Sequence, residues 1–195
     1  GQTVGRALVV DTSKYLNRML TLDEGSRTAT VEPGLTLDGL NKQLRGKKLF
    51  YPVDISTGSR GTLGGMAANN SCGARSVLYG KTIDHVLEQT VLLADGSVAH
   101  FRDVSRSEMP QAGLEGKLYE TVTRLASDLS SEIDARYPKG MRRVMGYNLD
   151  EFTDSSKPVN LAKLMVGSEG TLGIVLEAKL RLVPLPKAKV VMVVG

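Results

Sequence analysis

The sequence predicts an α+β fold, and two observations carry this prediction. Short runs of apolar and β-branched residues are separated by turn signals, of which Asp95-Gly96 is the strongest for a hairpin. A long amphipathic pattern extends from Leu114 to Ile133, where apolar residues recur every three or four positions. Antiparallel hairpins combined with long helices are typical of α+β domains.

The beginning of the chain predicts two strands and a helix. We expect Ala7 to Asp11 and Thr28 to Glu32 to be short strands on either side of a turn at Asp23-Glu24-Gly25. Thr36 is expected to cap a helix, which ends at Gly46 and whose apolar face consists of Leu37, Leu40 and Leu44.

The remainder of the chain predicts a hairpin, a helix and a strand. Val86 to His100 contains a strand around Val91 that turns at Asp95-Gly96 and returns through Val98. The amphipathic pattern from Leu114 to Ile133 predicts a helix of about five turns, which must end near Pro138. Between Ile174 and Leu182 apolar and charged residues alternate, which predicts a half-buried strand up to Pro184.

The composition excludes several classes of protein. With 195 residues, 41% hydrophobic and 24% charged, the chain is long enough to bury a core as one domain or as two small ones. Its apolar runs are far shorter than the roughly 20 residues of a spanning helix, so no transmembrane segment is expected. A net charge of +4, with 6 Tyr, 3 Phe and no Trp, does not indicate nucleic-acid binding.

Cys72 is the single cysteine of the sequence. It excludes an internal disulfide and any metal site built on several thiolates, and no metal site is predicted. A lone cysteine among Ala, Ser and Gly is more often an inert small residue than a reactive thiol. Because disulfides are absent, we expect a reducing, cytoplasmic compartment.

The two ends of the chain suggest a piece of a longer protein. Residue 1 is Gly and not Met, and the chain stops within the β-type run Val190 to Val194. Such a run would be an aggregation hazard as a bare edge, so we expect a partner strand for it.

A glycine-rich pattern, G-S-x-G-T-L-G, occurs twice, at Gly58 to Gly64 and Gly167 to Gly173. Glycines at this spacing let backbone amides point into one concavity, where they can hold a phosphate. Alternatively, both segments are tight turns that need glycine for a positive φ. Neither matches the P-loop pattern or G-x-G-x-x-G after a strand, so ordinary nucleotide-binding folds are disfavoured.

Small residues follow the first motif, from Met66 to Gly73. Small side chains permit close approach of a flat ligand, and Asn and Ser can pair with the polar edge of a heteroaromatic ring. The alternative is a tightly packed helix.

These segments together resemble a known family. The resemblance is carried by Tyr51 to Asp54, Thr62 to Gly73, Tyr79-Gly80, Arg143 to Leu149 and Val166 to Val175. They are similar to the FAD-binding domain of the p-cresol methylhydroxylase/vanillyl-alcohol oxidase superfamily. Within it the chain is most similar to FAD-linked oxidases of the glycolate oxidase subunit and D-lactate dehydrogenase group.

The resemblance implies two α+β subdomains with FAD between them, present here as a fragment. On this basis residues 1–51 end the first subdomain, residues 52–186 form the second, and residues 187–195 begin a substrate domain. In the family, a phosphate-binding segment precedes the position of Gly1, and the catalytic and metal-binding segment follows Pro186. We therefore expect no catalytic residue in this chain, and weak FAD binding or none by the chain alone.

The resemblance also implies which residues contact the cofactor, without a covalent link. The FAD diphosphate and ribityl chain would lie against Gly61, Thr62, Gly64 and Gly65. The flavin would lie along Asn69, Asn70, Ser71, Cys72 and Gly73. The adenine side or the flavin would lie near Gly170, Gly173 and Ile174.

Four cations without an intervening acid precede Tyr147, namely Arg136, Lys139, Arg142 and Arg143. They indicate either a cationic rim, in which Arg142 and Arg143 draw an anionic substrate to the flavin, or a solvated loop.

The function expected from the resemblance is oxidation of a small anionic 2-hydroxy acid, such as D-lactate, glycolate or D-2-hydroxyglutarate, with hydride transfer to flavin N5. Electrons would pass to a further acceptor, and the location would be peripheral to the inner membrane if that acceptor lies there. The alternative is a non-catalytic flavin- or anion-binding module of a multi-subunit complex.

Overall fold

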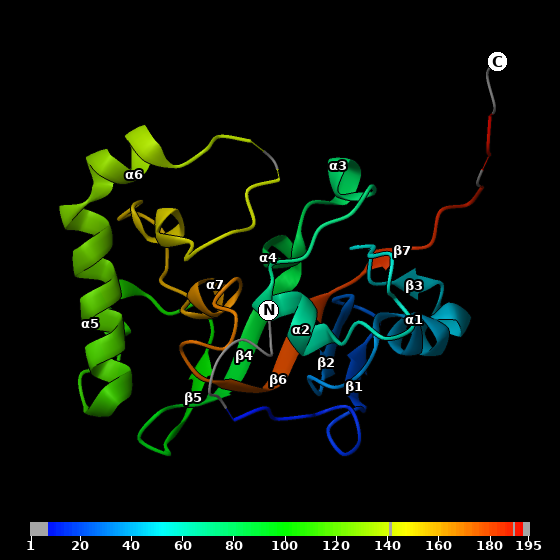
Figure 1. Ribbon diagram of the computed structural model, residues 1–195, viewed down its shortest axis with the longest axis horizontal. Coiled ribbons are helices and arrows are strands. Elements are labelled where there is room, and N and C mark those ends of the chain that lie inside the picture. Colours follow the sequence, from blue (N-terminus) through cyan, green and yellow to red (C-terminus); the bar gives the residue numbers. More distant parts are fainter. Residues whose placement is uncertain (1–7, 141, 189, 193–195) are drawn as a thin grey trace.

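A five-stranded antiparallel sheet forms the centre of the structure, a computed structural model that describes residues 8–140, 142–188 and 190–192 (Figure 1). The strand order is β1-β2-β6-β4-β5. The strands are β1 (Met19–Asp23), β2 (Thr28–Val31), β4 (Val86–Leu92), β5 (Val98–Phe101) and β6 (Ile174–Arg181). A second sheet pairs β3 (Leu49–Phe50) with β7 (Val183–Pro184).

The sheet is held together by β6, which pairs with two strands from distant parts of the chain. Ala29 of β2 lies opposite Leu180, and Gln89 of β4 lies opposite Ala178. Strands from both sides of the boundary expected at residue 51 therefore share one sheet, and the division into subdomains stays a prediction.

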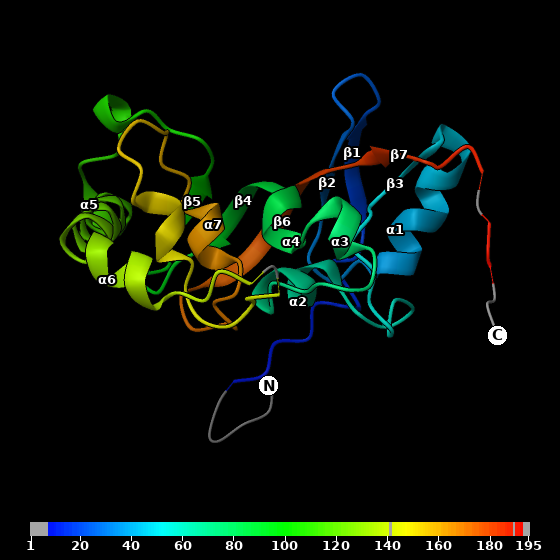
Figure 2. The same cartoon turned by 90° about the horizontal axis from the view of Figure 1, so that it is seen from above.

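Helices cover one face of this sheet and flank its two ends (Figures 1 and 2). The covering helices are α2 (Leu63–Ala68), α4 (Thr82–His85) and α7 (Ala162–Met165). The flanking helices are α1 (Leu37–Leu44) beside β3, and α5 (Gly113–Asp128) with α6 (Ser130–Arg136) at the opposite end. The short helix α3 (Ser76–Tyr79) and the 3₁₀ turns η1 (Arg45–Lys47), η2 (Arg106–Glu108) and η3 (Leu149–Phe152) complete the elements.

The predicted helix at Thr36 is confirmed as α1. The Thr36 hydroxyl accepts the Gly39 N–H at 3.1 Å, and Leu37, Leu40 and Leu44 are buried. The helix ends at Leu44, before the predicted Gly46, and Gly46 does not have a positive φ. The chain continues in η1, and Lys48 adopts the left-handed conformation with φ +56°.

The first predicted strand, Ala7 to Asp11, is wrong over its described part, and Ala7 lies outside the described residues. Leu8, Val9 and Val10 are exposed and form no strand. The strand that pairs with β2 is β1, because Leu22 and Asp23 reach Ala29 and Thr28 across a short turn. Apolar content favoured the earlier segment, whereas pairing depends on proximity across the turn.

The hairpin of β4 and β5 and the strand β6 are confirmed, but the long helix is divided. Leu129 interrupts it with φ −104° and ψ 14°, and α6 then continues to Arg136, just before Tyr137-Pro138. At the end of the chain, residues 190–192 form no strand, and residues 193–195 lie outside the described residues.

An ion pair at Glu32 anchors the segment that leads from β2 into α1. The buried Glu32 carboxylate accepts the Arg18 backbone N–H at 2.8 Å and its Nη2 at 2.8 Å. The hydrogen bonds from the Arg18 side chain lower the pKa of Glu32. The next residue, Pro33, accepts the Gly64 N–H through its carbonyl, so this anchor also helps to hold the start of α2.

We predict that Glu32→Gln lowers the free energy of unfolding by about 1–2 kcal/mol at pH 7, because a charged hydrogen-bond acceptor is lost. Since the folded pKa lies below the ordinary value of 4.5, this stability is present above that pH and is lost as the pH falls through the folded pKa. Urea unfolding of both proteins at several pH values measures the difference.

The matched control is Glu24→Gln, because Glu24 forms an exposed ion pair with Lys47 and should contribute less than about 0.5 kcal/mol. A difference for Glu32→Gln that remains unchanged well below the folded pKa would contradict the assignment.

Candidate functional site

The two glycine motifs, which begin 109 residues apart, lie against each other. The Gly167 N–H donates to the Ala67 carbonyl at 2.9 Å, and the Glu169 N–H donates to the Ala68 carbonyl at 3.1 Å. Both carbonyls belong to the last turn of α2, where a helix leaves carbonyls unpaired. The Ala67 carbonyl also accepts the Asn70 N–H at 3.0 Å, so the loop supplies a second donor to Ala67 and the donor to Ala68. The second motif thus completes the helix that the first motif begins.

A third segment joins them through Asn148. Its side chain is buried and donates through Nδ2 to the carbonyls of Val166 at 2.6 Å and Lys163 at 3.3 Å. The Tyr147 hydroxyl lies 2.8 Å from Thr171 Oγ1. We call the meeting point of residues 62–73, 146–148 and 166–173 the glycine junction.

In the first motif, the backbone amides are already engaged within the protein. The Gly61 N–H donates to the Thr57 carbonyl, the Gly64 N–H to the Pro33 carbonyl, and the Gly65 N–H to Thr62 Oγ1. These amides are therefore not available as a phosphate cradle. A ligand at Gly61, Thr62, Gly64 and Gly65 would therefore pack closely against the backbone, and would not be held by hydrogen bonds from these amides.

The glycines of the first motif are required by packing. Gly58, Gly61, Gly64 and Gly65 have no positive φ, so the turn explanation does not apply to them. A Cβ on Gly64 would lie 2.6 Å from Pro33 Cβ, and one on Gly61 would overlap Ile55 Cδ1.

The second motif does contain the predicted left-handed turn. Gly167 and Gly170 have φ +89° and +79°, and Glu169 between them has φ +50°. A Cβ on Gly170 would meet no atom within 4 Å, and this glycine is exposed. The turn therefore presents open backbone at the surface of the glycine junction.

Asn70 places a buried side-chain amide in the glycine junction, bonded at its oxygen and, within the described part of the chain, unpaired at its nitrogen. It is completely buried at 0% exposure and adopts a left-handed conformation with φ +46°, which Asn tolerates better than most residues. Its Oδ1 accepts the Ile83 N–H at 3.1 Å, which orients the amide. Its Nδ2 is buried and has no hydrogen-bond partner among the described residues.

The other predicted site residues have different surroundings. The Ser71 carbonyl accepts both the N–H and the hydroxyl of Thr82, while Cys72 is a free, half-buried thiol. Gly73 is packed so tightly on Asp54 that a Cβ would overlap its carbonyl. A Cβ on Gly173 would lie 2.9 Å from the Leu92 carbonyl of β4, whereas Ile174 is partly exposed at the start of β6.

A cavity of about 550 Å³ lies along the third segment, within the size range of small-molecule sites. Its lining is mostly apolar and consists of Tyr137, Pro138, Gly140, Arg142, Arg143, Val144, Met145, Gly146 and Tyr147. The cavity adjoins the glycine junction, because Gly146 and Tyr147 belong to both.

The cations of the predicted rim are mostly neutralised by acids from outside their segment. Arg136 pairs with Glu132, Lys139 with Asp134 at 2.6 Å, and Arg143 with Asp150 at 2.5 Å. Arg143 also lies over the Tyr137 ring, with 13% of its side chain exposed. Within the described part of the chain, Arg142 is the exposed member without an ion pair.

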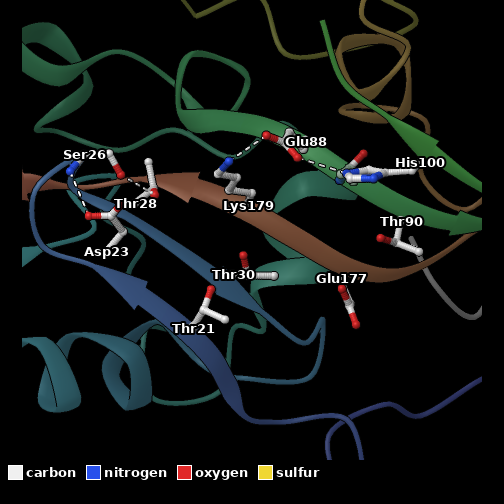
Figure 3. Close-up of a pocket in the computed structure, with 11 residues that line it drawn as sticks. Thr21, Asp23, Ser26, Thr28, Thr30, Glu88, Thr90, His100, Glu177 and Lys179 are labelled. Atoms are coloured by element: carbon white, nitrogen blue, oxygen red, sulfur yellow. Dashed lines mark hydrogen bonds and ion pairs between the residues drawn. The ribbon is translucent and has the colours of Figure 1, made fainter.

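A second cavity, of about 360 Å³, lies on the other face of the sheet and contains none of the predicted site residues (Figure 3). Threonines and acids line it, and Glu88 bridges Lys179 at 2.7 Å and His100 at 3.0 Å. An antiparallel sheet packed on one side commonly has such a polar solvent face. We therefore place the candidate site at the glycine junction.

Sequence reasoning missed several residues that build the glycine junction. Thr82 and Lys163 stand in segments without a motif, and a lysine beside leucines suggests an exposed helix face. Asn148 lies in the third segment, whose Gly-Tyr-Asn-Leu pattern was the available signal.

Over residues 8–140, 142–188 and 190–192, no cluster of three His, Cys, Asp or Glu side chains could hold a metal ion. None of the helices in these ranges combines the length and apolar character that a membrane span requires.

Comparison with known proteins finds a match to a family described as FAD binding domain, over residues 1–102. D-2-hydroxyglutarate dehydrogenase from Pseudomonas putida is 35% identical over 191 residues, which are 96% of this chain and 19% of that protein. The glycolate oxidase subunit GlcD of Bacillus subtilis is 34% identical over 90% of this chain and 27% of its own length. The chain thus spans about a fifth to a quarter of these relatives.

Among solved structures, alkyldihydroxyacetonephosphate synthase has a similar fold. The TM-score is 0.58 at 21% sequence identity, over 91% of this chain and 23% of that one. The predicted α+β class and the superfamily resemblance are confirmed.

We predict that Gly64→Ala destabilises the protein by about 1–3 kcal/mol, because the new methyl group collides with Pro33. Gly46→Ala is the control, since Gly46 is exposed, has no positive φ, and a Cβ there would meet no atom within 4 Å. Urea unfolding compares the two variants, and equal stabilities would show that Gly64 is not required for packing.

Proposed function

The chain belongs to the FAD binding domain family, and we propose that its glycine junction holds the FAD of an enzyme that oxidises a 2-hydroxy acid. Support for the substrate class comes from the relatives, which are named D-2-hydroxyglutarate dehydrogenase, glycolate oxidase subunit and D-lactate dehydrogenase. Since the chain spans only part of each relative, the activity is proposed for a whole protein that contains it.

The observation that carries the proposal is the unpartnered amide of Asn70. A buried N–H donor without an acceptor costs free energy, so a protein rarely keeps one without a ligand or a water molecule to accept it. Asn70 lies between the two glycine motifs, where a Cβ on Gly167 would be 3.6 Å from Asn70 Cβ. The heteroaromatic edge of a flavin offers suitable acceptors, so the residues present fit this cofactor.

The glycine junction would hold different parts of the cofactor through different groups. We assign the diphosphate and ribityl chain to Gly61, Thr62, Gly64 and Gly65, by close approach to their backbone. The stretch Asn69 to Gly73 would run along the flavin. Gly170, Gly173 and Ile174 would lie near the adenine side or the flavin, with Gly170 as the open position.

FAD, when bound without a covalent link, supplies an acceptor at N5 for the hydride that a 2-hydroxy acid loses from Cα. This chain's own contribution is to bind and orient that acceptor and to exclude water from it. Arg142 is better suited than Arg143 to attract the substrate carboxylate, because Asp150 already occupies the Arg143 guanidinium.

Two measurements test the proposed function. FAD titrated into the 195-residue chain should bind weakly or not at all, and it should bind more tightly to a protein of the relatives' length that contains this chain. In that longer protein, anaerobic addition of D-2-hydroxyglutarate, D-lactate or glycolate should bleach the flavin absorbance. Flavin that binds but is bleached by none of them would favour a non-catalytic module, and absence of binding to both proteins would refute the proposal.

We predict that Asn70→Asp raises the Kd for FAD at least tenfold, which corresponds to about 1.4 kcal/mol. Aspartate keeps the acceptor for the Ile83 N–H and tolerates the left-handed backbone, but it has no amide donor. Gln43→Glu on the exposed side of α1 makes the same amide-to-carboxylate change and should leave the Kd unchanged. Flavin fluorescence quenching gives both constants, and equal affinities would remove Asn70 from the site.

A further inference from the structure

Lys163 of α7 is a mostly buried cation that is bound by carbonyl groups. Its Nζ donates to the Ile83 carbonyl at 2.6 Å and to the Val86 carbonyl at 2.8 Å. Ile83 belongs to α4, and Val86 is the first residue of β4. Cations interact favourably with the carbonyl end of a helix, so this ammonium holds α4 where it meets the sheet.

The positive charge of Lys163 costs free energy of desolvation at this position. Burial lowers the pKa of Lys163, while the charges of Glu151, Asp84 and Asp103 act in the opposite direction. None of these acids forms an ion pair with Lys163 within the described residues. An apolar side chain of similar length would avoid the cost of desolvation, but it would remove the donor that Lys163 supplies to the Ile83 and Val86 carbonyls. Packing alone therefore does not account for a lysine.

What distinguishes Lys163 is its connection to the glycine junction on two sides. Ile83 accepts from Lys163 through its carbonyl and donates through its N–H to Asn70 Oδ1. The neighbouring Thr82 donates twice to the Ser71 carbonyl. On the other side, the Lys163 carbonyl accepts from Asn148 Nδ2, which also holds Val166 directly before the second glycine motif.

We propose that Lys163 is a positioning residue for the cofactor site: by holding α4 through Ile83, it fixes the direction in which the Asn70 amide points. The cofactor part of this inference rests on the proposed function. Lys163 itself does not touch the cofactor. The Lys163 side chain acts on Asn70 through Ile83, whose carbonyl accepts from Lys163 and whose N–H donates to Asn70 Oδ1.

The test compares Lys163→Met with wild type by hydrogen exchange in the absence of FAD. The amides of Thr82 and Ile83 should exchange at least tenfold faster in the variant, whereas the amide of Val91 in β4 should be unchanged. Lys117→Met, a lysine loss on the exposed side of α5, should change none of these rates. Should Lys163→Met not fold, Lys163→Gln is measured in the same way.

FAD titration then tests whether the position of α4 affects binding of the cofactor. Lys163→Met should raise the Kd for FAD at least tenfold. Because both residues act through the same amide, adding Lys163→Met to Asn70→Asp should raise the Kd little further. If the double variant raised the Kd by the product of the two single-variant factors, the connection through Asn70 would be overturned.

The outcomes separate this inference from the proposed function. Unchanged exchange at Thr82 and Ile83 would overturn the role of Lys163, and so would equal acceleration at Val91, because a general loss of stability would then explain it. If neither the chain nor the longer protein that contains it binds FAD, the proposed function fails, while the exchange rates still decide whether Lys163 holds Ile83 and Asn70.

Discussion

The candidate site depends on a pair of backbone hydrogen bonds, from the Gly167 and Glu169 amides to the last carbonyls of α2. A helix end leaves carbonyls without partners, and here a loop from residues 166–173 donates to the Ala68 carbonyl and adds a second donor to the Ala67 carbonyl, which also accepts the Asn70 N–H. The left-handed conformations of Gly167, Glu169 and Gly170 allow the loop to turn onto the helix.

Buried polar side chains extend that contact into a network. Asn148 supports the second motif, Asn70 stands between the motifs, and Lys163 holds the helix to which Asn70 is bonded. Buried polar groups are costly when they are unpaired, so such a network favours a single arrangement of its members. In this arrangement, the Nδ2 of Asn70 is a buried donor without a partner at the glycine junction, whereas the other such donors among the described residues, those of Gln89, Arg106 and Tyr119, lie outside it. The polar cavity on the other face of the sheet contrasts with it, because Glu88, Lys179 and His100 pair with one another there.

The helix α1, the β4–β5 hairpin and the strand β6 were predictable from the sequence. Each depends on signals within a few residues: a Thr cap with leucines at helical spacing, an Asp-Gly turn, and alternation of apolar and charged residues. The strand expected at residues 7–11 was wrong because apolar content does not establish a pairing partner. The break at Leu129 was also missed, since the spacing of apolar residues continues across it.

By itself, the sequence determined the fold class and the cofactor family, and it pointed to the segments that meet at the glycine junction, because these follow from local spacing and from long motifs in a fixed order. The tertiary structure alone decided why each glycine is needed. Gly64 is required by contact with Pro33, Gly170 by a left-handed turn, and Gly173 by packing against β4. It also decided that Arg143 is paired and that the partly buried Lys163 donates to two backbone carbonyls. These properties arise from contacts between residues far apart in the chain, which no local pattern records.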